Sequence, residues 1–399
     1  MNEAYLYEGE LAHTVDQGMM DRFLLWACEQ KASDVVLRAN DPPWIQVEGQ
    51  WYPCARHFVL SASETQLLTN LFSGQEHKAG NVQRGLSADF AYSVRVPEKR
   101  GLVQRFRVNV TASNVGHYLV LRALPRDLPR LEDLALPRKL VPHLYPENGM
   151  VLISGVMGSG KSTLLAGMLH SAILRQSFGG LGLGRQILTL EEPIEFDFAT
   201  IPHHQRSAPI AQSAIPGHVL DWASGVRSMT RRKGEMVMVG EARDLETLKA
   251  LLQIVEQGVT CYATVHAKDV SQTITRIIHS FPEHERAEAA TLLKANLRVI
   301  LHQRLVPQAQ GRGRVALREY LVFDEAIRLS LYESPYEELM TTVRSQLRQK
   351  GHPLLVDARA RFAEGMIGRE VYAAICEEQR DFCQHFSAPD YNKFDETLL

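Results

Sequence analysis

The sequence predicts an α/β protein in which a smaller N-terminal α+β domain precedes a larger C-terminal domain with a mostly parallel sheet. Three observations carry this prediction. The chain has 399 residues, which is more than one hydrophobic core usually organises. A proline-rich stretch, residues 125–146, separates two regions of different texture. After it, short apolar strands alternate with helical stretches, the pattern of a parallel sheet covered by helices on both faces.

Composition and charge are those of an ordinary globular protein. Hydrophobic residues make up 45% and charged residues 23%, and the formal net charge of -2 provides no global field for attracting a polyanion. The five cysteines are scattered without a C-x-x-C pair, which argues against a disulfide scaffold or a zinc ribbon. The N-terminus MNEAYLYEGELAH lacks the order of a secretory signal, and no apolar run reaches the ~18 residues of a spanning helix. We therefore expect a cytoplasmic protein.

The first domain, residues 1–124, is expected to combine helices with an antiparallel sheet. A helix is predicted over 19–31, and another after Ser61, because Ser61 and Glu64 have capping-box spacing. The predicted strands lie in SDVVLRAN, IQVEGQWYP, ADFAYSVRV, VQRFRVNV and HYLVLRAL. The prolines of residues 125–146 then predict a stiff, extended linker.

The second domain, residues 147–330, is expected to place strands at MVLIS, QILTL, EMVMVG and CYATVHA. Loops are predicted at SFGGLGLGRQ near Ser177 and at PHHQRSAPIAQSAIPGH near Pro202, where glycine, proline and serine interrupt the pattern. Residues 331–399 are expected to form a helical extension.

The stretch GVMGSGKST matches the phosphate-binding pattern G-x-x-x-x-G-K-[ST]. In that pattern the backbone N–H groups converge on phosphate oxygens, the lysine neutralises the β- and γ-phosphates, and the hydroxyl after it binds Mg²⁺. The motif lies between a predicted strand and a predicted helix, whose positive end faces the same anion. A plain glycine-rich turn would not need that context. The expected nucleotide-binding residues are Gly155, Met157, Gly158, Ser159, Gly160, Lys161, Ser162 and Thr163.

Hydrolysis of the nucleotide needs carboxylates that hold Mg²⁺ and polarise a water, and two predicted strand ends offer them. EMVMVGEARD delivers Glu241, and QILTLEEPIEF delivers Glu191 and Glu192, with Glu195 one bend later. Ligands of open α/β sheets bind at such carboxyl ends. The alternative for any single glutamate is an exposed, solubilising charge. His266, which ends ATVHA, is either a sensor of the γ-phosphate or a structural histidine.

Four sequence boxes in a fixed order carry a family resemblance. GVMGSGKST, LTLEEPIEF, MVMVGEARD and ATVHAKDVSQTITRII resemble the Walker A, Asp box, Walker B and His box of the secretion and type IV pilus ATPase superfamily. ASDVVLRANDPPWIQVEGQ and RFRVNV are similar to its N-terminal strands, and SFPEHERAEAATLLKANLRVILHQRLVP to its helix pair after the His box. The resemblance covers residues 30–325. It implies an N-terminal PAS-like domain, a RecA-like P-loop ATPase domain, and a homohexamer that binds ATP and Mg²⁺ between domains.

The resemblance also implies roles for single residues. Catalytic roles fall on Glu191, with Glu195 as a second acidic position, on Glu241 and on His266. Family members generally have Asp where this chain has Glu192, so either Glu191 or Glu192 can face the magnesium. HAKD replaces the usual HTN, which removes an asparagine role from the His box. The expected metal ligands are Ser162, Glu192 and Glu241.

Rings of this kind supply arginines to the γ-phosphate from another domain or subunit. On VQRFRVNV, Arg105 and Arg107 share one face of the strand, while Phe106 and Val108 share the other. We expect Arg105 and Arg107 in the catalytic role, with Arg122 as a third candidate. A solvated strand face is an equally open interpretation, and the basic stretch RSMTRRKGE is either a solvated helix end or a contact with nucleotide or a neighbour.

No C-x-x-C pair occurs, so we expect no paired-cysteine zinc element of the kind that type II secretion and pilus assembly ATPases carry, and the N-terminal region is expected to be too short for their additional domains. Its glutamate-rich LEEPIEF, the insert after it and its altered His box resemble the type IVB secretion and conjugal transfer ATPases, the DotB-like and plasmid TraJ-like class. The expected function is a hexameric ATPase that powers secretion or conjugal DNA transfer through ATP-driven motions across the linker. Proteins of an inner-membrane complex would hold it as a peripheral partner.

Three alternatives stay open. A type IV pilus retraction motor would be the same enzyme with a different load. A nucleic-acid translocase is disfavoured by the near-zero net charge and by the lack of a basic strip with stacking aromatics, so we expect no sequence-specific contact with nucleic acid. The third alternative is a regulator that binds nucleotide without hydrolysing it. Unchanged ATP turnover after replacement of Glu191 and of Glu241 by Gln would remove the enzymatic assignment.

Overall fold

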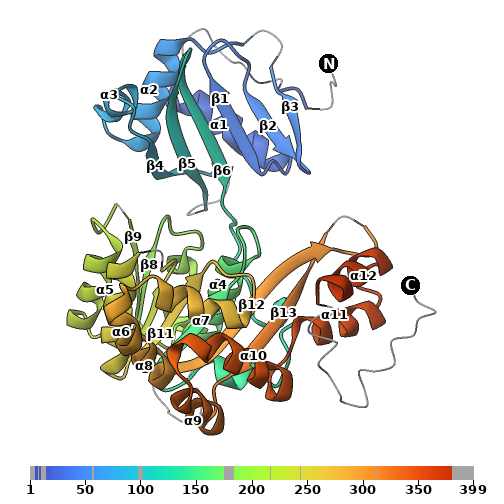
Figure 1. Cartoon of the computed structure of the whole chain (residues 1–399). Helices are drawn as coiled ribbons and strands as arrows, with labels where there is room; N and C mark the ends of the chain where they lie inside the picture. Colours follow the sequence, from blue (N-terminus) through green and yellow to red (C-terminus); the bar gives the residue numbers. More distant parts are fainter. Residues whose placement is uncertain are drawn as a thin grey trace. The chain divides into compact units, whose positions relative to one another are not determined.

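A computed structural model of the chain divides into two compact units (Figure 1). One unit comprises residues 1–128 together with 193–197, and the other comprises residues 129–192 and 198–399. The structure describes residues 5–7, 9, 15–55, 58–97, 102–174, 184–215, 217–242, 244–311 and 313–379. Among these residues, no helix combines the length and apolar character that a bilayer crossing requires.

In its described residues, the N-terminal unit forms a six-stranded antiparallel sheet in the order β3-β2-β1-β6-β5-β4. The strands are β1 (Asp34–Arg38), β2 (Trp44–Val47), β3 (Gln50–Pro53), β4 (Ala88–Arg95), β5 (Val103–Ser113) and β6 (Gly116–Ala123). The helices are α1 (Gln17–Glu29), α2 (Ala62–Ser73) and α3 (Lys78–Gln83). Phe23, Leu37 and Phe106 are fully buried in the core between them. Ser61 caps α2 in a capping box with Glu64, as their spacing predicts.

The proline-rich stretch 125–146 is not the extended linker that its prolines predict. Most of it belongs to the second unit, and the chain passes from one unit to the other at residues 128–129. It contains the short 3₁₀ helices η1 (Glu132–Leu134) and η2 (Val141–Leu144). Leu140 and Leu144 are fully buried, and the Tyr262 hydroxyl donates to the Leu144 carbonyl at 2.9 Å. The apolar residues between the prolines decide the packing of this segment.

The C-terminal unit is built on a sheet with seven described strands in the order β13-β12-β7-β11-β10-β8-β9. All neighbours are parallel except β13, which pairs antiparallel with β12 at one edge. The strands are β7 (Gly149–Ser154), β8 (Ile187–Glu191), β9 (Ile210–Ala214), β10 (Met236–Val239), β11 (Thr260–Val265), β12 (Leu297–Pro307) and β13 (Arg314–Val322). The mostly parallel sheet expected from the alternating pattern is confirmed.

Within the described chain, two strands lie where the sequence predicts other structure. Strand β9 falls inside the loop predicted near Pro202 and pairs with β8 at the sheet edge. Strand β12 occupies LRVILHQRLVP, where the resemblance implies the second of two helices; helix α8 (Arg286–Asn296) ends just before it. Pairing with both β7 and β13 stabilises β12, and its run of valine, isoleucine and leucine suits a doubly buried strand. Most of the loop predicted near Ser177 lies outside the described residues.

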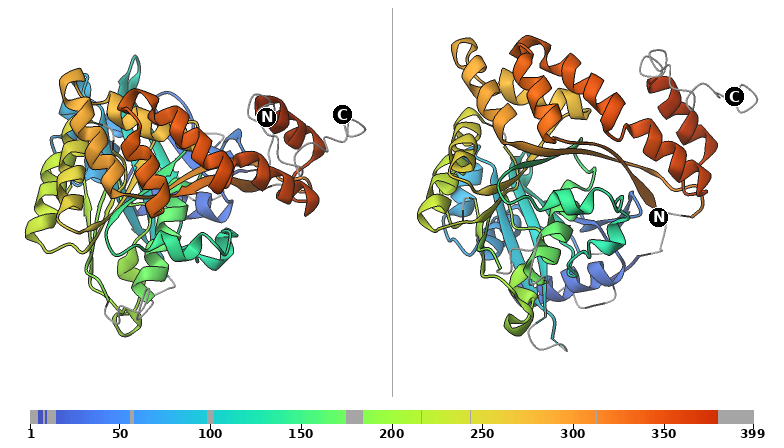
Figure 2. Two further views of the ribbon diagram at one scale, coloured as in Figure 1. Left: turned by 60° about the horizontal axis from the view of Figure 1, so that its bottom comes forward. Right: turned by 90° about the horizontal axis from the view of Figure 1, so that it is seen from below.

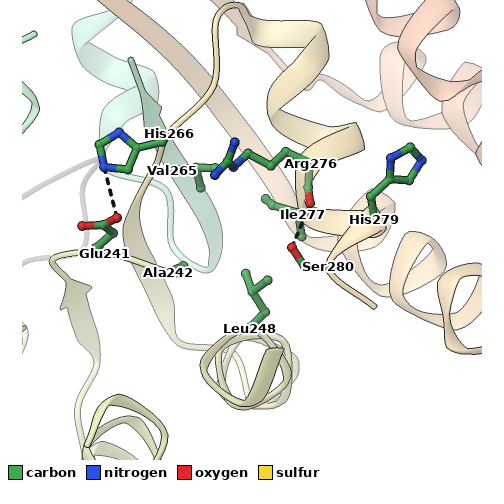
Figure 3. Close-up of a pocket in the computed structure, with 9 residues that line it drawn as sticks. All are labelled: Glu241, Ala242, Leu248, Val265, His266, Arg276, Ile277, His279 and Ser280. Carbon is green, nitrogen blue, oxygen red and sulfur yellow. Dashed lines mark hydrogen bonds and ion pairs between the residues drawn. The ribbon is translucent and has the colours of Figure 1, made fainter. Parts of the chain in front are cut away.

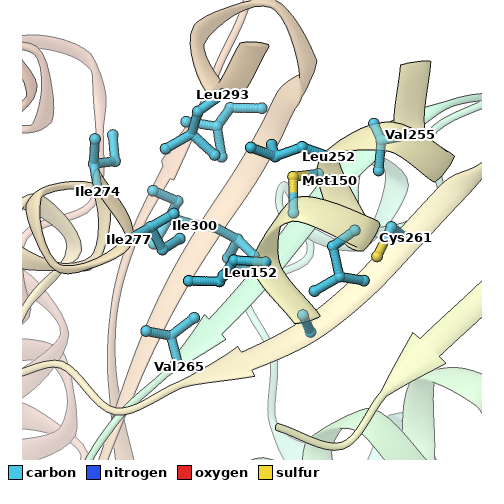
Figure 4. Packing of buried hydrophobic residues seen from close by; sticks show 14 of the residues in the cluster. Met150, Leu152, Leu252, Val255, Cys261, Val265, Ile274, Ile277, Leu293 and Ile300 are labelled. Atoms are coloured by element: carbon cyan, nitrogen blue, oxygen red, sulfur yellow. The ribbon is translucent and has the colours of Figure 1, made fainter. Parts of the chain in front are cut away.

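Helices cover both faces of this sheet (Figure 2). Helix α4 (Lys161–Leu174) lies on one face, and α5 (Trp222–Arg231), α6 (Leu245–Glu256), α7 (Val270–His279) and α8 lie on the other. Figure 4 shows the core on the second face, where Met150 and Leu152 of β7 pack with Ile277 of α7 and Leu293 of α8. The short 3₁₀ helices η3 (Phe198–Thr200), η4 (His203–Gln205), η5 (Glu283–Glu285) and η6 (Tyr336–Glu338) fill connections.

After β13 the described chain is helical, with α9 (Glu325–Glu333), α10 (Leu339–Lys350), α11 (Leu354–Ala363) and α12 (Arg369–Glu378). Helices α11 and α12 pack on the β12–β13 hairpin through an apolar cluster of their own, which includes Val306, Leu317, Leu354 and Ile375. Of the expected extension over 331–399, residues 380–399 lie outside the described residues.

Candidate active site

The phosphate-binding motif connects the end of β7 to the start of α4. Strand β7 is buried along its whole length, and α4 begins at Lys161. Gly155, Gly158 and Gly160 have φ angles of 152°, 73° and 82°, in the region that favours glycine. The loop between them exposes Val156 and Met157, with Met157 86% exposed. These backbone angles place the glycines of the motif where a loop that wraps an anion needs them.

Lys161 turns back over the loop that precedes it. Its ammonium donates to the carbonyls of Gly155 and Val156, both at 2.9 Å, and the residue is 9% exposed. From this position the charge reaches oxygens of an anion bound to the loop amides. Ser162 is exposed and Thr163 is half-buried in the first turn of α4, so both hydroxyl-bearing residues stand at the helix end next to the loop.

The sheet order decides how the predicted carboxylates stand relative to the loop. Strands β8 and β10 are neighbours, with Leu190 opposite Val239, so Glu191 and Glu241 follow adjacent strand ends. Strand β11, which leads to His266, lies between β10 and the loop-bearing strand β7. With strands ~4.8 Å apart, β10 lies about 10 Å and β8 about 14 Å from β7. Along this edge the order is loop, His266, Glu241, Glu191.

Glu241 and His266 are in contact, with Nε2 of His266 3.0 Å from Oε1 of Glu241. The side chains are 17% and 32% exposed, respectively. Both line a pocket of about 510 Å³, together with Leu248 of α6 and Arg276 of α7 (Figure 3). Figure 3 shows the guanidinium of Arg276 directed toward the end of β11 that carries His266. The pair joins two residues that the sequence predicted separately, and Arg276 adds a cation that the sequence did not mark.

Glu191 is 8% exposed and is held by two side chains. The Thr189 hydroxyl donates to its Oε1 at 2.6 Å, and the Gln212 amide donates to the same oxygen at 3.0 Å. The other end of the Gln212 amide accepts from the Phe198 N–H at 2.8 Å, which fixes its orientation. Sequence reasoning missed both partners. Thr189 could have been found from the sequence, because it precedes Glu191 by two residues and therefore lies on the same face of the strand. Gln212 could not, because it lies in a segment predicted as loop.

The other two predicted acidic residues, Glu192 and Glu195, follow Glu191 in the chain and belong to different units. Glu192 directly follows β8 and is half-buried. Glu195 lies in the segment 193–197, which groups with the N-terminal unit. The structure therefore places Glu195 in a different unit from Glu191 and Glu241.

No group of three or more His, Cys, Asp or Glu side chains that could hold a metal ion occurs in the described part of the chain. Mg²⁺ in nucleotide sites keeps several waters and takes one or two protein oxygens besides phosphate. The Ser162 hydroxyl and the Glu241 carboxylate are hard oxygen ligands of that kind. The donor set suits a magnesium ion that enters with a nucleotide.

The predicted arginines of the N-terminal unit share one face of its sheet. Arg107 on β5 lies directly opposite Arg122 on β6. Arg107 stands 3.9 Å from Asp89, and Arg122 donates to Asp34 at 2.8 Å. Each guanidinium group thus has a carboxylate partner, while the Arg107 and Arg122 side chains are 38% and 65% exposed.

Arg105 lies on the same face as Arg107 and donates from Nη2 to the Ile194 carbonyl at 2.6 Å. Its Nη1 is buried and has no hydrogen-bond partner among the described residues.

The basic stretch RSMTRRKGE lies at the end of α5. Its Arg232 donates to the hydroxyl of Ser213 on the edge strand β9 at 3.2 Å, which is a structural contact.

The sequence profile described as "Type II/IV secretion system protein" matches residues 81–379. The chain belongs to the type II/IV secretion system protein family. The solved structure of the ATPase DotB of Legionella pneumophila superposes on this family member with a TM-score of 0.84 and 34% identity, covering 94% of this chain and 99% of DotB. The pilus retraction motor PilT with bound ADP superposes with a TM-score of 0.73 and 27% identity, covering 88% and 95%.

In sequence, this member of the type II/IV secretion family is 29% identical to the type IV pilus retraction ATPase PilT of Pseudomonas aeruginosa. That similarity covers 87% of this chain and 95% of the relative. The chain is therefore a nucleotide-binding ATPase with a RecA-like C-terminal unit. The expected superfamily, α/β fold and enzyme class are confirmed.

Proposed function

We propose that this ATPase works as a homohexamer that powers a type IVB secretion or conjugal DNA transfer apparatus. One observation carries the proposal: 99% of the DotB chain superposes on this chain at a TM-score of 0.84, against 0.73 for the retraction motor PilT. In this role the protein would sit in the cytoplasm, held at the inner membrane by proteins of the transfer complex. The identity to DotB is also the higher of the two, 34% against 27%.

In the proposed site, the amides around Gly158 and the Lys161 ammonium bind the β- and γ-phosphates of ATP. The Ser162 hydroxyl and the Glu241 carboxylate would hold Mg²⁺, which neutralises charge on the phosphate oxygens. Glu192 is the alternative second carboxylate for the ion. His266 lies 3.0 Å from the Glu241 carboxylate, so it is proposed to sense the γ-phosphate through that carboxylate.

Glu191 is proposed as the residue that orients the attacking water and accepts its proton. Thr189 and Gln212 both donate to Oε1 of its carboxylate. Because the carboxylate is planar, these two bonds also set the direction of Oε2. Arg105 and Arg107 are proposed to stabilise charge on the γ-phosphate within the assembled ring. The unpartnered, buried Nη1 of Arg105 supports this role, because an anion would satisfy it. Glu195 is proposed to assist Glu191 when the ring closes.

A second function, type IV pilus retraction, is favoured by a specific observation. The similarity to the P. aeruginosa retraction ATPase covers 95% of that protein. A retraction motor would use the same catalytic site, so only the load separates the two proposals.

The experiment that separates them is complementation of a strain from which the gene has been deleted. Wild-type protein, Lys161→Ala and the surface variant Lys249→Ala are each returned to the strain. Conjugal DNA transfer, effector secretion and twitching motility are then measured. We expect wild-type and Lys249→Ala to restore transfer or secretion, and Lys161→Ala to restore neither. Restoration of twitching alone would instead assign the protein to pilus retraction.

Mass photometry with a non-hydrolysable ATP analogue tests the proposed hexamer. A protein that stays monomeric under these conditions would contradict it.

A further inference from the structure

A series of buried hydrogen bonds runs from the phosphate loop to helix α11. Gln303 of β12 is 3% exposed; its Nε2 donates to the Ser159 carbonyl at 2.7 Å, and its Oε1 accepts from Nε of Arg318 at 2.9 Å. A guanidinium only donates, so Arg318 determines which end of the Gln303 amide faces the loop. The backbone N–H of Arg318 donates in turn to Asp357 of α11 at 3.0 Å.

The first of these bonds sets the direction of a peptide group in the loop. The peptide between Ser159 and Gly160 is planar and trans, so its C=O and N–H point in opposite directions. Because Gln303 holds the carbonyl, the Gly160 N–H points away from β12. The phosphate-binding motif uses the N–H groups of this part of the loop as donors to phosphate. The bond from Gln303 therefore orients one donor of the phosphate site.

The loop and Gln303 are also in close contact. A Cβ atom on Gly160 would lie 2.9 Å from Nε2 of Gln303, and one on Gly155 would lie 2.4 Å from the Gln303 carbonyl oxygen. Both distances are shorter than real Cβ contacts, so these two glycines allow the loop to rest on β12. A shift of Gln303 would be transmitted directly to the loop backbone.

The far end of the series is held by helix α11 and by the end of η1. Arg318 is 2% exposed, and its guanidinium donates to the carbonyls of Leu134 at 2.6 Å and Ala135 at 3.1 Å. Arg361 of α11 donates to the same Ala135 carbonyl at 2.9 Å. Asp357 is 3% exposed. Burial lowers the pKa of Arg318 to about 10, so the guanidinium is still charged at neutral pH.

We propose that Gln303 is a positioning residue for the phosphate loop, and that α11 holds Gln303 in place through Asp357 and Arg318. The C-terminal helices then influence nucleotide affinity without touching the nucleotide. This inference rests on the nucleotide site proposed above and adds how that site is kept in shape.

The test replaces Gln303 by Glu, which keeps an oxygen for Arg318 but sets a second oxygen against the Ser159 carbonyl. We expect the Kd values of ATP, ADP and pyrophosphate each to rise about tenfold, because all three need the oriented amide. The KM for ATP should rise by a similar factor while kcat changes less than about threefold. Gln303→Met is the second variant, in case Gln303→Glu fails to fold. Methionine has about the same length but no amide to donate or accept, and it should raise the Kd about fivefold. Asp357→Asn should raise it about threefold.

Arg304→Gln is the matched control. Arg304 is the next residue on β12, and its Nη1 lies 2.6 Å from Glu378 of α12, so it joins the same strand to the same helices on the surface. We expect wild-type affinity for this variant. Wild-type affinity in a folded Gln303→Glu or Gln303→Met protein would overturn the inference, and so would an equal loss in Arg304→Gln. A wild-type protein that binds no ATP would instead contradict the nucleotide site itself.

Discussion

The two flanks of the phosphate loop are built in different ways. On the β12–β13 flank, Gln303 and Arg318 are at most 3% exposed and are hydrogen-bonded mainly to backbone groups. On the β10–β11 flank, Glu241 and His266 are 17% and 32% exposed and are paired with each other. A buried polar group is costly to detach from its partner, whereas a partly solvated pair exchanges partners at little cost. In the proposed site, the β12–β13 flank would therefore be preorganised, and we expect the Glu241–His266 contact on the other flank to exchange partners more easily.

The largest expected effect comes from the residue between the two flanks. Lys161→Ala removes the cation that lies over the loop, and ATP turnover should fall at least about 100-fold. The measurement is phosphate release under saturating ATP. Lys249→Ala is the control, because Lys249 pairs with Glu285 on the surface at 2.7 Å. Wild-type turnover by Lys161→Ala would contradict the proposed role of the Lys161 ammonium in binding the phosphates.

The buried flank should show itself in the pH dependence of stability. Burial raises the pKa of Glu319 from 4.5 to about 7, and burial lowers the pKa of His302 from 6.5 to about 4. Stability from Glu319 is therefore present below pH 4.5 and is lost as pH rises to about 7. Stability from His302 is present above pH 6.5 and is lost as pH falls to about 4. The two slopes oppose each other between pH 4.5 and 6.5.

Single substitutions should expose these opposing slopes. In Glu319→Gln the His302 slope is left alone, so the free energy of unfolding should rise by about 3 kcal/mol between pH 4 and pH 6.5. In His302→Gln the remaining Glu319 slope should lower it by a similar amount between pH 4.5 and pH 7. Chemical denaturation across this range is the measurement. Equal and flat profiles for both variants would show that this flank is not buried as described.

On the β10–β11 flank we expect a smaller effect. His266→Gln keeps a hydrogen-bond donor for Glu241 but removes the ionisable ring, so kcat should fall about tenfold with little change in KM. His284→Gln is the control, since His284 is 80% exposed and lies 3.7 Å from Glu285. Equal kcat values for wild-type and His266→Gln would argue that His266 is structural.

The smallest effect is expected from the two side chains that donate hydrogen bonds to Glu191. Thr189→Val removes the hydrogen bond from the Thr189 hydroxyl to Glu191, and Gln212→Leu removes the one from the Gln212 amide. Each should lower kcat about fivefold, the worth of one hydrogen bond. If the double variant loses no more than either single variant, the two donors act as one unit. Unchanged kcat in both single variants would show that the orientation of Glu191 does not matter.

Local patterns predicted much of the fold and of the candidate site, and long-range strand pairing decided the rest. The loop over 155–163, the strand end at Glu241 and the cap at Ser61 each depend on residues close in sequence, so their spacing was sufficient. Gln212 and Gln303 acquire their roles only when β9 and β12 join the sheet. Neither strand was predicted, because β9 is a short edge strand and β12 continues directly from a helix. The prolines of 125–146 likewise concealed the burial of Leu140 and Leu144.

The most direct test of the proposed catalytic site compares ATP binding with ATP hydrolysis in Glu191→Gln and Glu241→Gln. Both variants keep the loop and Lys161, so each should bind ATP within about threefold of wild-type while turnover falls at least about 100-fold. Glu192→Gln, measured in parallel, reports whether the adjacent carboxylate shares the metal role. Wild-type turnover in both Glu191→Gln and Glu241→Gln would contradict the claim that these two strand ends complete the catalytic site.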